Sequence, residues 1–336
     1  MQFVRRKHAP LLAFIILILI CIVFILSLNS GSVSISPHEV WSTLLGKGTP
    51  EQNLTLFELR LPRMVIALLI GCGLAISGAI MQGLSRNDLA DPGLMGVHAG
   101  SGLAVVLLMY LVFQSGTVAS YNAMSIPIFA FVGALLTALI IYALAWRKGI
   151  LPIRLILVGL AVGEGLRAIY IILSLKLSDE VYMGATVWLA GSLTGTGWPI
   201  VIAILPWITI LSLYAFYNNR YLDALSFGES TTTSIGVKVN RERLKFLLVS
   251  VGLAGACVAA GGGIGFIGLM APHIARKLVG SKYKVIIPIS ALIGALLLLL
   301  CDWFARTILP RVEVPAGILV SLVGAPYFLY LLLRSK

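Results

Sequence analysis

Runs of about 20 apolar residues recur along the whole chain, separated by short polar connections. A helix needs about 20 such residues to cross the hydrocarbon core of a bilayer. Of the residues, 59% are hydrophobic and only 11% are charged, whereas a soluble domain has roughly a quarter charged. The sequence therefore predicts an all-α polytopic membrane protein, one domain over residues 1–336, with about ten transmembrane helices. We expect them near 10–28, 61–82, 92–113, 124–146, 153–175, 198–216, 244–262, 264–280, 285–308 and 315–333.

The distribution of basic residues predicts the orientation. The eighth span, 264–280, is the weakest because it contains Pro272 and Arg276, but counting it places both termini on the same side. With that side cytosolic, 18 of the 25 Lys and Arg residues lie there, as the positive-inside rule predicts. The seven exceptions are Lys47, Arg60, Arg63, Arg167, Lys176, Arg306 and Arg311. The formal charge of +12 is thus an orientation signal, and no nucleic-acid partner is predicted.

The N-terminus has the charge order of a signal peptide, Arg5-Arg6-Lys7 followed by an apolar run from Leu11 to Leu28. That run is long for a signal peptide, and no small-x-small cleavage site precedes Gly31. We expect a retained first span.

The sequence contains no complete catalytic or cofactor-binding motif. Residues 263–268 fit the Gly-x-Gly-x-x-Gly dinucleotide pattern, but they join two predicted spans and do not follow a soluble strand. A P-loop is absent from the sequence, so ATP-driven transport would need an ATPase on another subunit. The four cysteines and four histidines lack the spacing of metal ligands. We predict no cofactor, metal site or catalytic residue, and an intramembrane enzyme lacks the cluster it would need.

One short motif occurs twice. Gly93-Leu94-Met95-x-x-His98 recurs as Gly268-Leu269-Met270-x-x-His273. In the predicted topology the two copies run in opposite directions, as in the inverted repeats of transporters. Chance is the alternative interpretation.

Glu164 and Arg167 are the charges deepest in a predicted span. They are three residues apart, so they share a helix face and can pair. Ionisable residues at this depth usually face the bundle interior or a water-filled cavity. Either the pair lines a transport pathway or it only neutralises itself. A proton- or sodium-coupled secondary transporter that uses Glu164 is the alternative function, and the lack of a second strong intramembrane carboxylate argues against it.

The longest polar connection on the inner side runs from 218 to 245. Ser226 or the Gly228-Glu229 pair can begin a short helix there, and Gly236 can end it. A helix presented to the cytosol would be a docking surface, and a solvated loop is the alternative.

Several ordered segments together resemble the FecCD family of permeases, the membrane subunits of ABC importers for ferric siderophores, haem and cobalamin. The likeness extends over nearly the whole chain and is carried by residues 60–63, 73–93, 225–237, 265–276, 313–317 and 324–326.

The resemblance implies a type II ABC importer permease fold in a bacterial cytoplasmic membrane. It also implies a second permease copy or paralogue, two cytosolic ABC ATPases and an extracytoplasmic substrate-binding protein. Ferric siderophores are the first expectation for the substrate, with haem and cobalamin left open.

The resemblance also assigns residues. Arg60, Arg63 and Arg306 resemble the arginines that receive acidic residues of the binding protein, a role suited to exposed guanidinium forks. A second set resembles the coupling helix that sits in a groove of the ATPase: Leu225, Ser226, Phe227, Gly228, Glu229, Ser234, Ile235 and Gly236. Asp88 departs from the family pattern, which usually has proline there, and the Glu164–Arg167 pair is not part of that pattern.

Overall fold

The computed structural model describes residues 9–30, 36–114, 124–146, 152–309 and 313–334, and every regular element in them is helical. The long helices are α2 (Ala9–Asn29), α5 (Leu61–Ser85), α6 (Val97–Gln114), α7 (Ser125–Ala145), α8 (Pro152–Ser174), α10 (Trp198–Tyr217), α13 (Val239–Gly261), α15 (Tyr283–Thr307) and α16 (Ala316–Arg334). The short ones are α3 (Pro37–Leu44), α4 (Pro50–Asn53), η1 (Leu54–Arg60), η2 (Pro92–Met95), α9 (Asp179–Leu189), α11 (Asn219–Ser226), α12 (Glu229–Ser234) and α14 (Ile267–Val279). The predicted basic residues Arg5, Arg6, Lys7, Arg147, Lys148, Arg311 and Lys336 lie outside the described residues.

Nine helices of the described part are long and apolar enough to cross a membrane. The eighth predicted span is not among them. Its helix, α14, has 13 residues and is about 20 Å long at 1.5 Å per residue, shorter than a hydrocarbon core of about 30 Å. The residues before it are irregular, with Gly262 at φ +69° and Phe266 at φ +63°. The prediction of a full-length helix at 264–280 is therefore wrong.

The third predicted span, 92–113, also begins differently. The 3-10 turn η2 opens it, and α6 starts only at Val97. The two copies of the Gly-Leu-Met motif thus differ in local structure, since Gly268 lies inside α14 and Gly93 inside η2.

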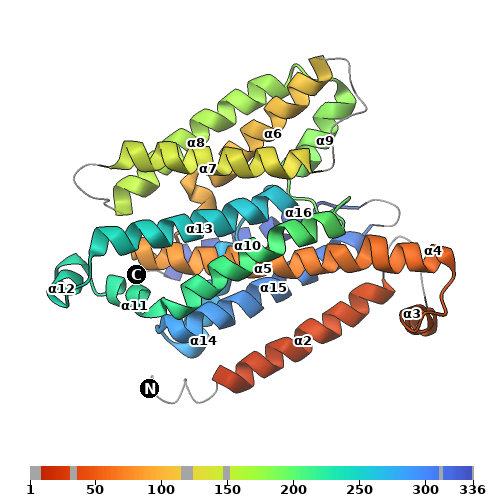
Figure 1. The fold of residues 1–336 in the computed structure, drawn as a ribbon, viewed down its shortest axis with the longest axis horizontal. Helices are drawn as coiled ribbons and strands as arrows, with labels where there is room; N and C mark the ends of the chain where they lie inside the picture. Colours follow the sequence, from red (N-terminus) through yellow and green to blue (C-terminus); the bar gives the residue numbers. More distant parts are fainter. Residues whose placement is uncertain (1–8, 31–35, 115–123, 147–151, 310–312, 335–336) are drawn as a thin grey trace.

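The helices form two layers (Figure 1). Helix α5 lies in the larger layer and packs against α10, α13, α14 and α15, while α2 packs against α15. Helices α6, α7, α8 and α9 form the second layer, joined to the first mainly through α13. The start of α2 and the short helices α11 and α12 lie at one end of the molecule, and α3 and α4 lie at the other.

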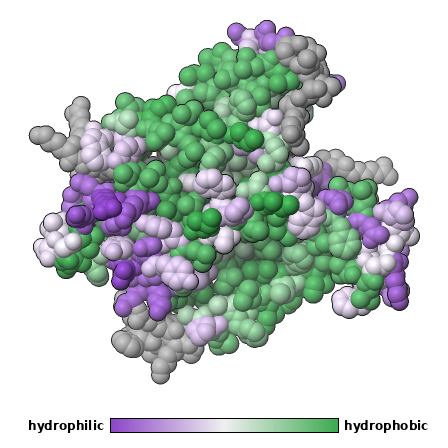
Figure 2. All heavy atoms as spheres, viewed as in Figure 1, coloured by the Kyte–Doolittle hydropathy of each residue, from purple (hydrophilic) through white to green (hydrophobic). Residues whose placement is uncertain are grey.

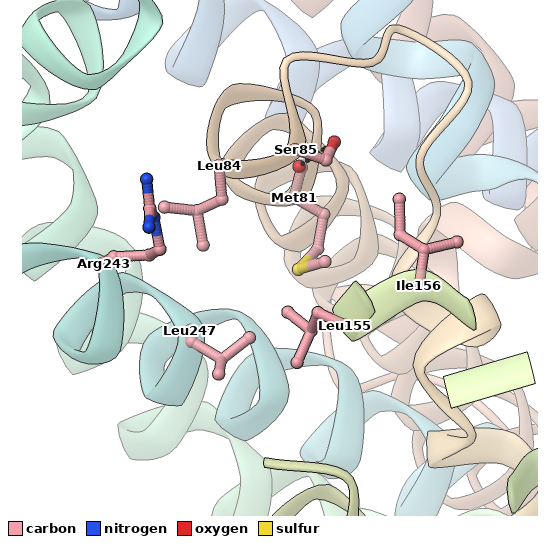
Figure 3. Close-up of a pocket in the computed structure, with 7 residues that line it drawn as sticks. All are labelled: Met81, Leu84, Ser85, Leu155, Ile156, Arg243 and Leu247. Atoms are coloured by element: carbon pink, nitrogen blue, oxygen red, sulfur yellow. Dashed lines mark hydrogen bonds between the residues drawn. The ribbon is translucent and has the colours of Figure 1, made fainter. Parts of the chain in front are cut away.

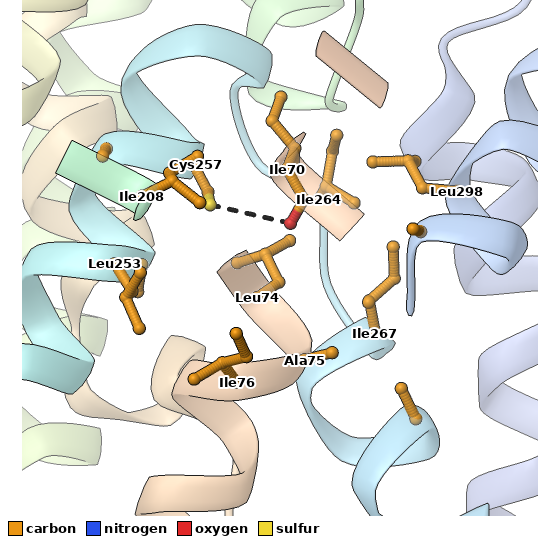
Figure 4. Packing of buried hydrophobic residues seen from close by; sticks show 14 of the residues in the cluster. Ile70, Leu74, Ala75, Ile76, Ile208, Leu253, Cys257, Ile264, Ile267 and Leu298 are labelled. Carbon is orange, nitrogen blue, oxygen red and sulfur yellow. Dashed lines mark hydrogen bonds between the residues drawn. The ribbon is translucent and has the colours of Figure 1, made fainter. Parts of the chain in front are cut away.

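Glycines allow the central helices to touch. A Cβ on Gly71 would lie 2.3 Å from the carbonyl oxygen of Gly294 in α15, and one on Gly78 would lie 1.8 Å from that of Gly268 in α14. Small residues permit this approach between membrane helices, where lipid offers no hydrophobic force to drive association. Aliphatic side chains fill the space beside these contacts, as Figure 4 shows for Ile70, Leu74 and Ile267.

The molecular surface matches a bilayer. Hydrophobic residues cover the middle of the visible face, and hydrophilic residues gather at the two ends, over α11–α12 and near α3–α4 (Figure 2). The large exposed side chains are mostly Leu, Ile and Val of the long helices. An apolar band between polar ends is what a polytopic protein presents to lipid.

Candidate functional site

Two of the three predicted docking arginines share one carboxylate near the C-terminal end of α15. Asp302 in α15 accepts a hydrogen bond from Arg63 Nε at 2.9 Å on one oxygen and from Arg306 Nε at 3.2 Å on the other. Arg63 also donates from Nη1 to Glu313 at 2.6 Å. Asp302 is fully buried, so this network lies within the protein and not on its rim.

The burial of these arginines differs from the prediction. Arg60, Arg63 and Arg306 are only 5%, 7% and 8% exposed, so the expectation of exposed guanidinium groups is wrong. Arg60 donates to the carbonyl of Leu28 at the end of α2, and Arg306 donates to the hydroxyl of Ser27. Each guanidinium thus has partners within the chain, and a docking protein could contact these arginines only through a cavity.

Such a cavity opens at this end, with a volume of about 300 Å³. All three arginines line it, together with Glu313, Glu58 and the 193–197 connection between α9 and α10. Burial alone raises the pKa of the Glu313 carboxyl, but the hydrogen bond and charge of Arg63, the Thr194 hydroxyl and Arg306 outweigh it. The net pKa of Glu313 therefore lies below its ordinary value, and the group stays charged.

At the opposite end, the predicted inner segment forms two short helices. Helix α11 ends at Ser226, and α12 runs from Glu229 to Ser234, bounded by Gly228 at φ +106° and Gly236 at φ +81°. The buried Thr232 hydroxyl bonds back to the carbonyls of Ala224 and Gly228, each at 2.6 Å. The short helix expected between Gly228 and Gly236 is present, although α13 already begins at Val239, inside the 218–245 connection.

Two apolar side chains flank α12 on the outside. Phe227 is 70% exposed and Ile235 is 60% exposed, at the polar end of the molecule where apolar side chains have no lipid to cover them. Exposed apolar groups rimmed by polar residues are typical of protein interaction sites.

Helix α12 is also tied to the long helices. Glu229 lies 3.5 Å from Arg243 of α13, and Arg243 lines a small cavity with Leu84 of α5 and Leu155 of α8. Figure 3 shows these side chains converging from the three helices. Helix α12 is thus linked to α13 by this ion pair, and Arg243 in turn borders a cavity shared with α5 and α8.

Asp88, the residue that departs from the family pattern, has a partner. It pairs with Arg276 of α14 at 2.5 Å, and Arg276 also donates to Gln82 of α5 at 2.9 Å. The aspartate thus ties the connection after α5 to α14.

Glu164 and Arg167 share one face of α8, as predicted from their spacing. Arg167 Nε lies 3.7 Å from Glu164 Oε2, and the two side chains are 54% and 61% exposed. Most of α8 is exposed, including Leu157, Leu160 and Ile172. The pair therefore lies on the outer surface of this single chain, away from its packed core.

Comparison with known proteins identifies the family to which this chain belongs. The FecCD transport family matches residues 17–334. The chain belongs to this family. Its relatives include the iron(3+)-hydroxamate import system permease protein FhuG of Bacillus subtilis, 45% identical over 333 residues, which are 98% of this chain and 99% of FhuG. The iron-uptake system permease protein FeuC of the same organism is 41% identical, covering 98% of each chain.

The relatives are not limited to permeases named for iron-hydroxamate import. The hemin transport system permease protein HmuU of Yersinia pestis is 38% identical, covering 98% of each chain. A solved structure of a metal-chelate type ABC transporter in an inward-facing conformation superposes with a TM-score of 0.85 at 28% identity, covering 97% of this chain and 99% of that one. This FecCD protein is thus a multi-pass ABC permease, and its predicted fold class is confirmed.

Proposed function

We propose that this chain is the permease of an ATP-driven importer of ferric siderophores in a bacterial cytoplasmic membrane. In this proposal two cytosolic ATPases drive it, a substrate-binding protein delivers the chelate, and a second permease copy or paralogue completes the pathway. The observation that carries the proposal is the end-to-end likeness to permeases named for iron-hydroxamate import and iron uptake.

The α11–α12 end would face the cytosol. The start of α2 lies at this end, and the basic residues Arg220, Lys238, Arg241 and Lys245 lie in or beside α11, α12 and the start of α13. The positive-inside rule supports this orientation. Helix α2 begins and α16 ends at this end of the molecule (Figure 1), so both termini would be cytosolic.

The outer cavity would receive an acidic side chain of the binding protein. Arg60, Arg63 and Arg306 all line this cavity, so each is a candidate for that contact. Arg60→Gln should weaken docking several-fold, since one charged contact at an interface tunes association without carrying it all. Unchanged affinity of the purified binding protein for this variant complex would contradict the docking role.

Helix α12, with Phe227 and Ile235, would be the surface that contacts an ATPase. Its link through Arg243 to α5, α8 and α13 supports a path for the motion. The Glu164–Arg167 face of α8 would line the translocation pathway, because lipid would be a costly neighbour for both charges.

The proposed function is tested by reconstituting the permease with the ATPase and binding protein encoded beside it. Liposomes whose ATPase subunits face the lumen should accumulate radioactive iron from an external ferric siderophore only when the lumen contains ATP. Uptake that follows a proton or sodium gradient without ATP, and that is abolished by Glu164→Gln, would instead support a secondary transporter.

A further inference from the structure

A second cavity lies beside the Glu164–Arg167 pair and is lined mainly by polar groups. It has a volume of about 130 Å³ and is bordered by His98 and Ala99 of α6, Arg167 and Tyr170 of α8, Trp188 and Leu189 of α9, and Gly263. Four separate parts of the chain thus meet at one small space.

The cavity lies at membrane depth. Arg167 is 15 residues after the start of α8, about 22 Å along the helix, and seven residues before its end, about 10 Å. Helix α9 returns beside α6 and ends at Leu189 against the irregular connection after α13. A Cβ on Gly263 would lie 2.3 Å from the Leu189 carbonyl oxygen and 3.8 Å from His98 Nδ1, so a side chain at 263 would intrude here.

The lining favours an anionic oxygen ligand. Arg167 carries a full positive charge, and the Tyr170 hydroxyl and Trp188 indole are hydrogen-bond donors. None of the lining residues is acidic, and Glu164 contacts Arg167 from the adjacent turn, through Nε. A guanidinium can hold a carboxylate by two parallel hydrogen bonds, which adds geometric specificity to the charge attraction.

The size of the cavity limits what enters. At roughly 30 Å³ per water molecule, 130 Å³ holds about four waters, enough for the end of a chelate but not for a whole ferric siderophore. The Arg167 side chain is half exposed on the α8 face, so it borders both the cavity and the open surface.

We propose that this cavity is a subsite that binds a terminal carboxylate of the transported chelate. The inference rests on the proposed function, because it assumes that the α8 face borders the pathway. Arg167 binds the carboxylate, and Tyr170 and Trp188 orient it. The subsite would select among chelates by the charge of their free end.

The test uses three linear ferric trihydroxamates that differ only in a terminal amine, acetamide or carboxylate. Uptake is measured with the full complex in liposomes, and equilibrium binding with the purified complex in nanodiscs. Arg167→Gln should lower the preference for carboxylate over acetamide about tenfold, as expected for losing a hydrogen bond to a charged group. Tyr170→Phe should lower it a few-fold. Tyr182→Phe, on exposed α9 surface outside the cavity, is the matched control and should leave it unchanged.

Since Arg167→Gln alone leaves Glu164 unpaired, the double variant Glu164→Gln/Arg167→Gln is measured beside it and should show the same loss of preference. An equal loss for all three chelates would indicate a structural role and overturn the subsite, as would equal carboxylate binding by the native and double-variant complexes. If native liposomes move none of the chelates with ATP, the siderophore function fails, and the binding measurement still decides the subsite.

Discussion

Asp302 pairs with two arginines near the C-terminal end of α15. Its oxygens accept from Arg63 and Arg306, and it is fully buried between α5 and α15. A buried carboxylate between two guanidinium groups is tolerated only because each charge is paired. The arginines that resemble docking residues therefore also hold helices together.

The first prediction concerns this carboxylate. Asp302→Asn should lower the free energy of unfolding by about 3 kcal/mol, because two buried guanidinium groups lose their shared counter-charge. Thermal unfolding of the purified permease in detergent measures the change. Glu313→Gln, at a half-buried position, should cost clearly less, and an equal cost would show that Asp302 is not the centre of the network.

The second prediction concerns pH. Since the folded-state pKa of Glu313 is lowered, its ionised carboxylate stabilises the fold above the ordinary pKa of about 4.3. That contribution is lost as the pH falls through the lower, folded-state pKa. The difference in Tm between the native protein and Glu313→Gln should be constant near neutral pH and shrink below about pH 4. A difference that grows on acidification would contradict the assigned pKa direction.

At the scale of elements, the contact of α5 with α14 depends on Gly78. The third prediction is that Gly78→Ala lowers the free energy of unfolding by about 1–3 kcal/mol, because its methyl group would overlap the Gly268 carbonyl and separate the helices. Gly184→Ala in α9 is the control, since no atom lies within 4 Å of its Cβ position. Equal Tm values for the two variants would contradict the close approach of α5 and α14.

The sequence predicts the long helices well because each buries an apolar run in lipid, a signal that needs no tertiary information. It misses α9, whose 11 residues are too short for a spanning window, although Ser178 followed by Asp179 and Glu180 is a helix-start pattern. It also misses α3, where the capping box Ser36–Glu39 was a readable signal. The shortness of α14 is different, because it depends on backbone breaks at Gly262 and Phe266.

The candidate sites show the same division. Gly228 and Gly236 predict the ends of α12, since positive φ angles favour glycine. The burial of the arginines follows from partners far along the chain, such as Leu28 for Arg60 and Asp302 for Arg63. Only the four-residue spacing of Asp302 and Arg306 could have suggested that network. The polar cavity near His98 is formed by four separate segments of the chain. Local sequence patterns therefore do not predict it.

The fourth prediction concerns α12. Phe227→Ser and Ile235→Ser should each weaken ATPase binding about tenfold, because each removes an apolar side chain from the proposed contact. Co-purification and the affinity of the isolated ATPase for the permease in nanodiscs measure this. Leu45→Ser is the matched control, an exposed leucine near α3 at the opposite end. Unchanged ATPase affinity in both α12 variants would remove the docking role.

At the scale of the whole molecule, one face of α8 would be costly to expose to lipid if this chain stood alone in a membrane. That face carries Glu164 and Arg167, both more than half exposed, among apolar side chains. Charged groups at this depth need protein or water beside them. A second permease packed near α8 would supply both, with a wet pathway enclosed between the two chains.

The last prediction separates that arrangement from a pair that only neutralises itself. In a protein whose four cysteines are replaced by alanine, a cysteine at 164 should react with a membrane-impermeant thiol reagent in at least one transport state of the assembled complex. A cysteine replacing Leu136, an exposed residue of α7 that should face lipid, should stay unreactive.

The double variant Glu164→Leu/Arg167→Met should fold, because removing both charges leaves neither one unpaired, whereas Arg167→Met alone should fold poorly. If the pair lines the pathway, the double variant should lose transport of the carboxylate chelate and keep transport of the acetamide chelate. Normal transport of both chelates by the double variant, or a cysteine at 164 that is unreactive in every state, would mean that this face of α8 is closed to the substrate.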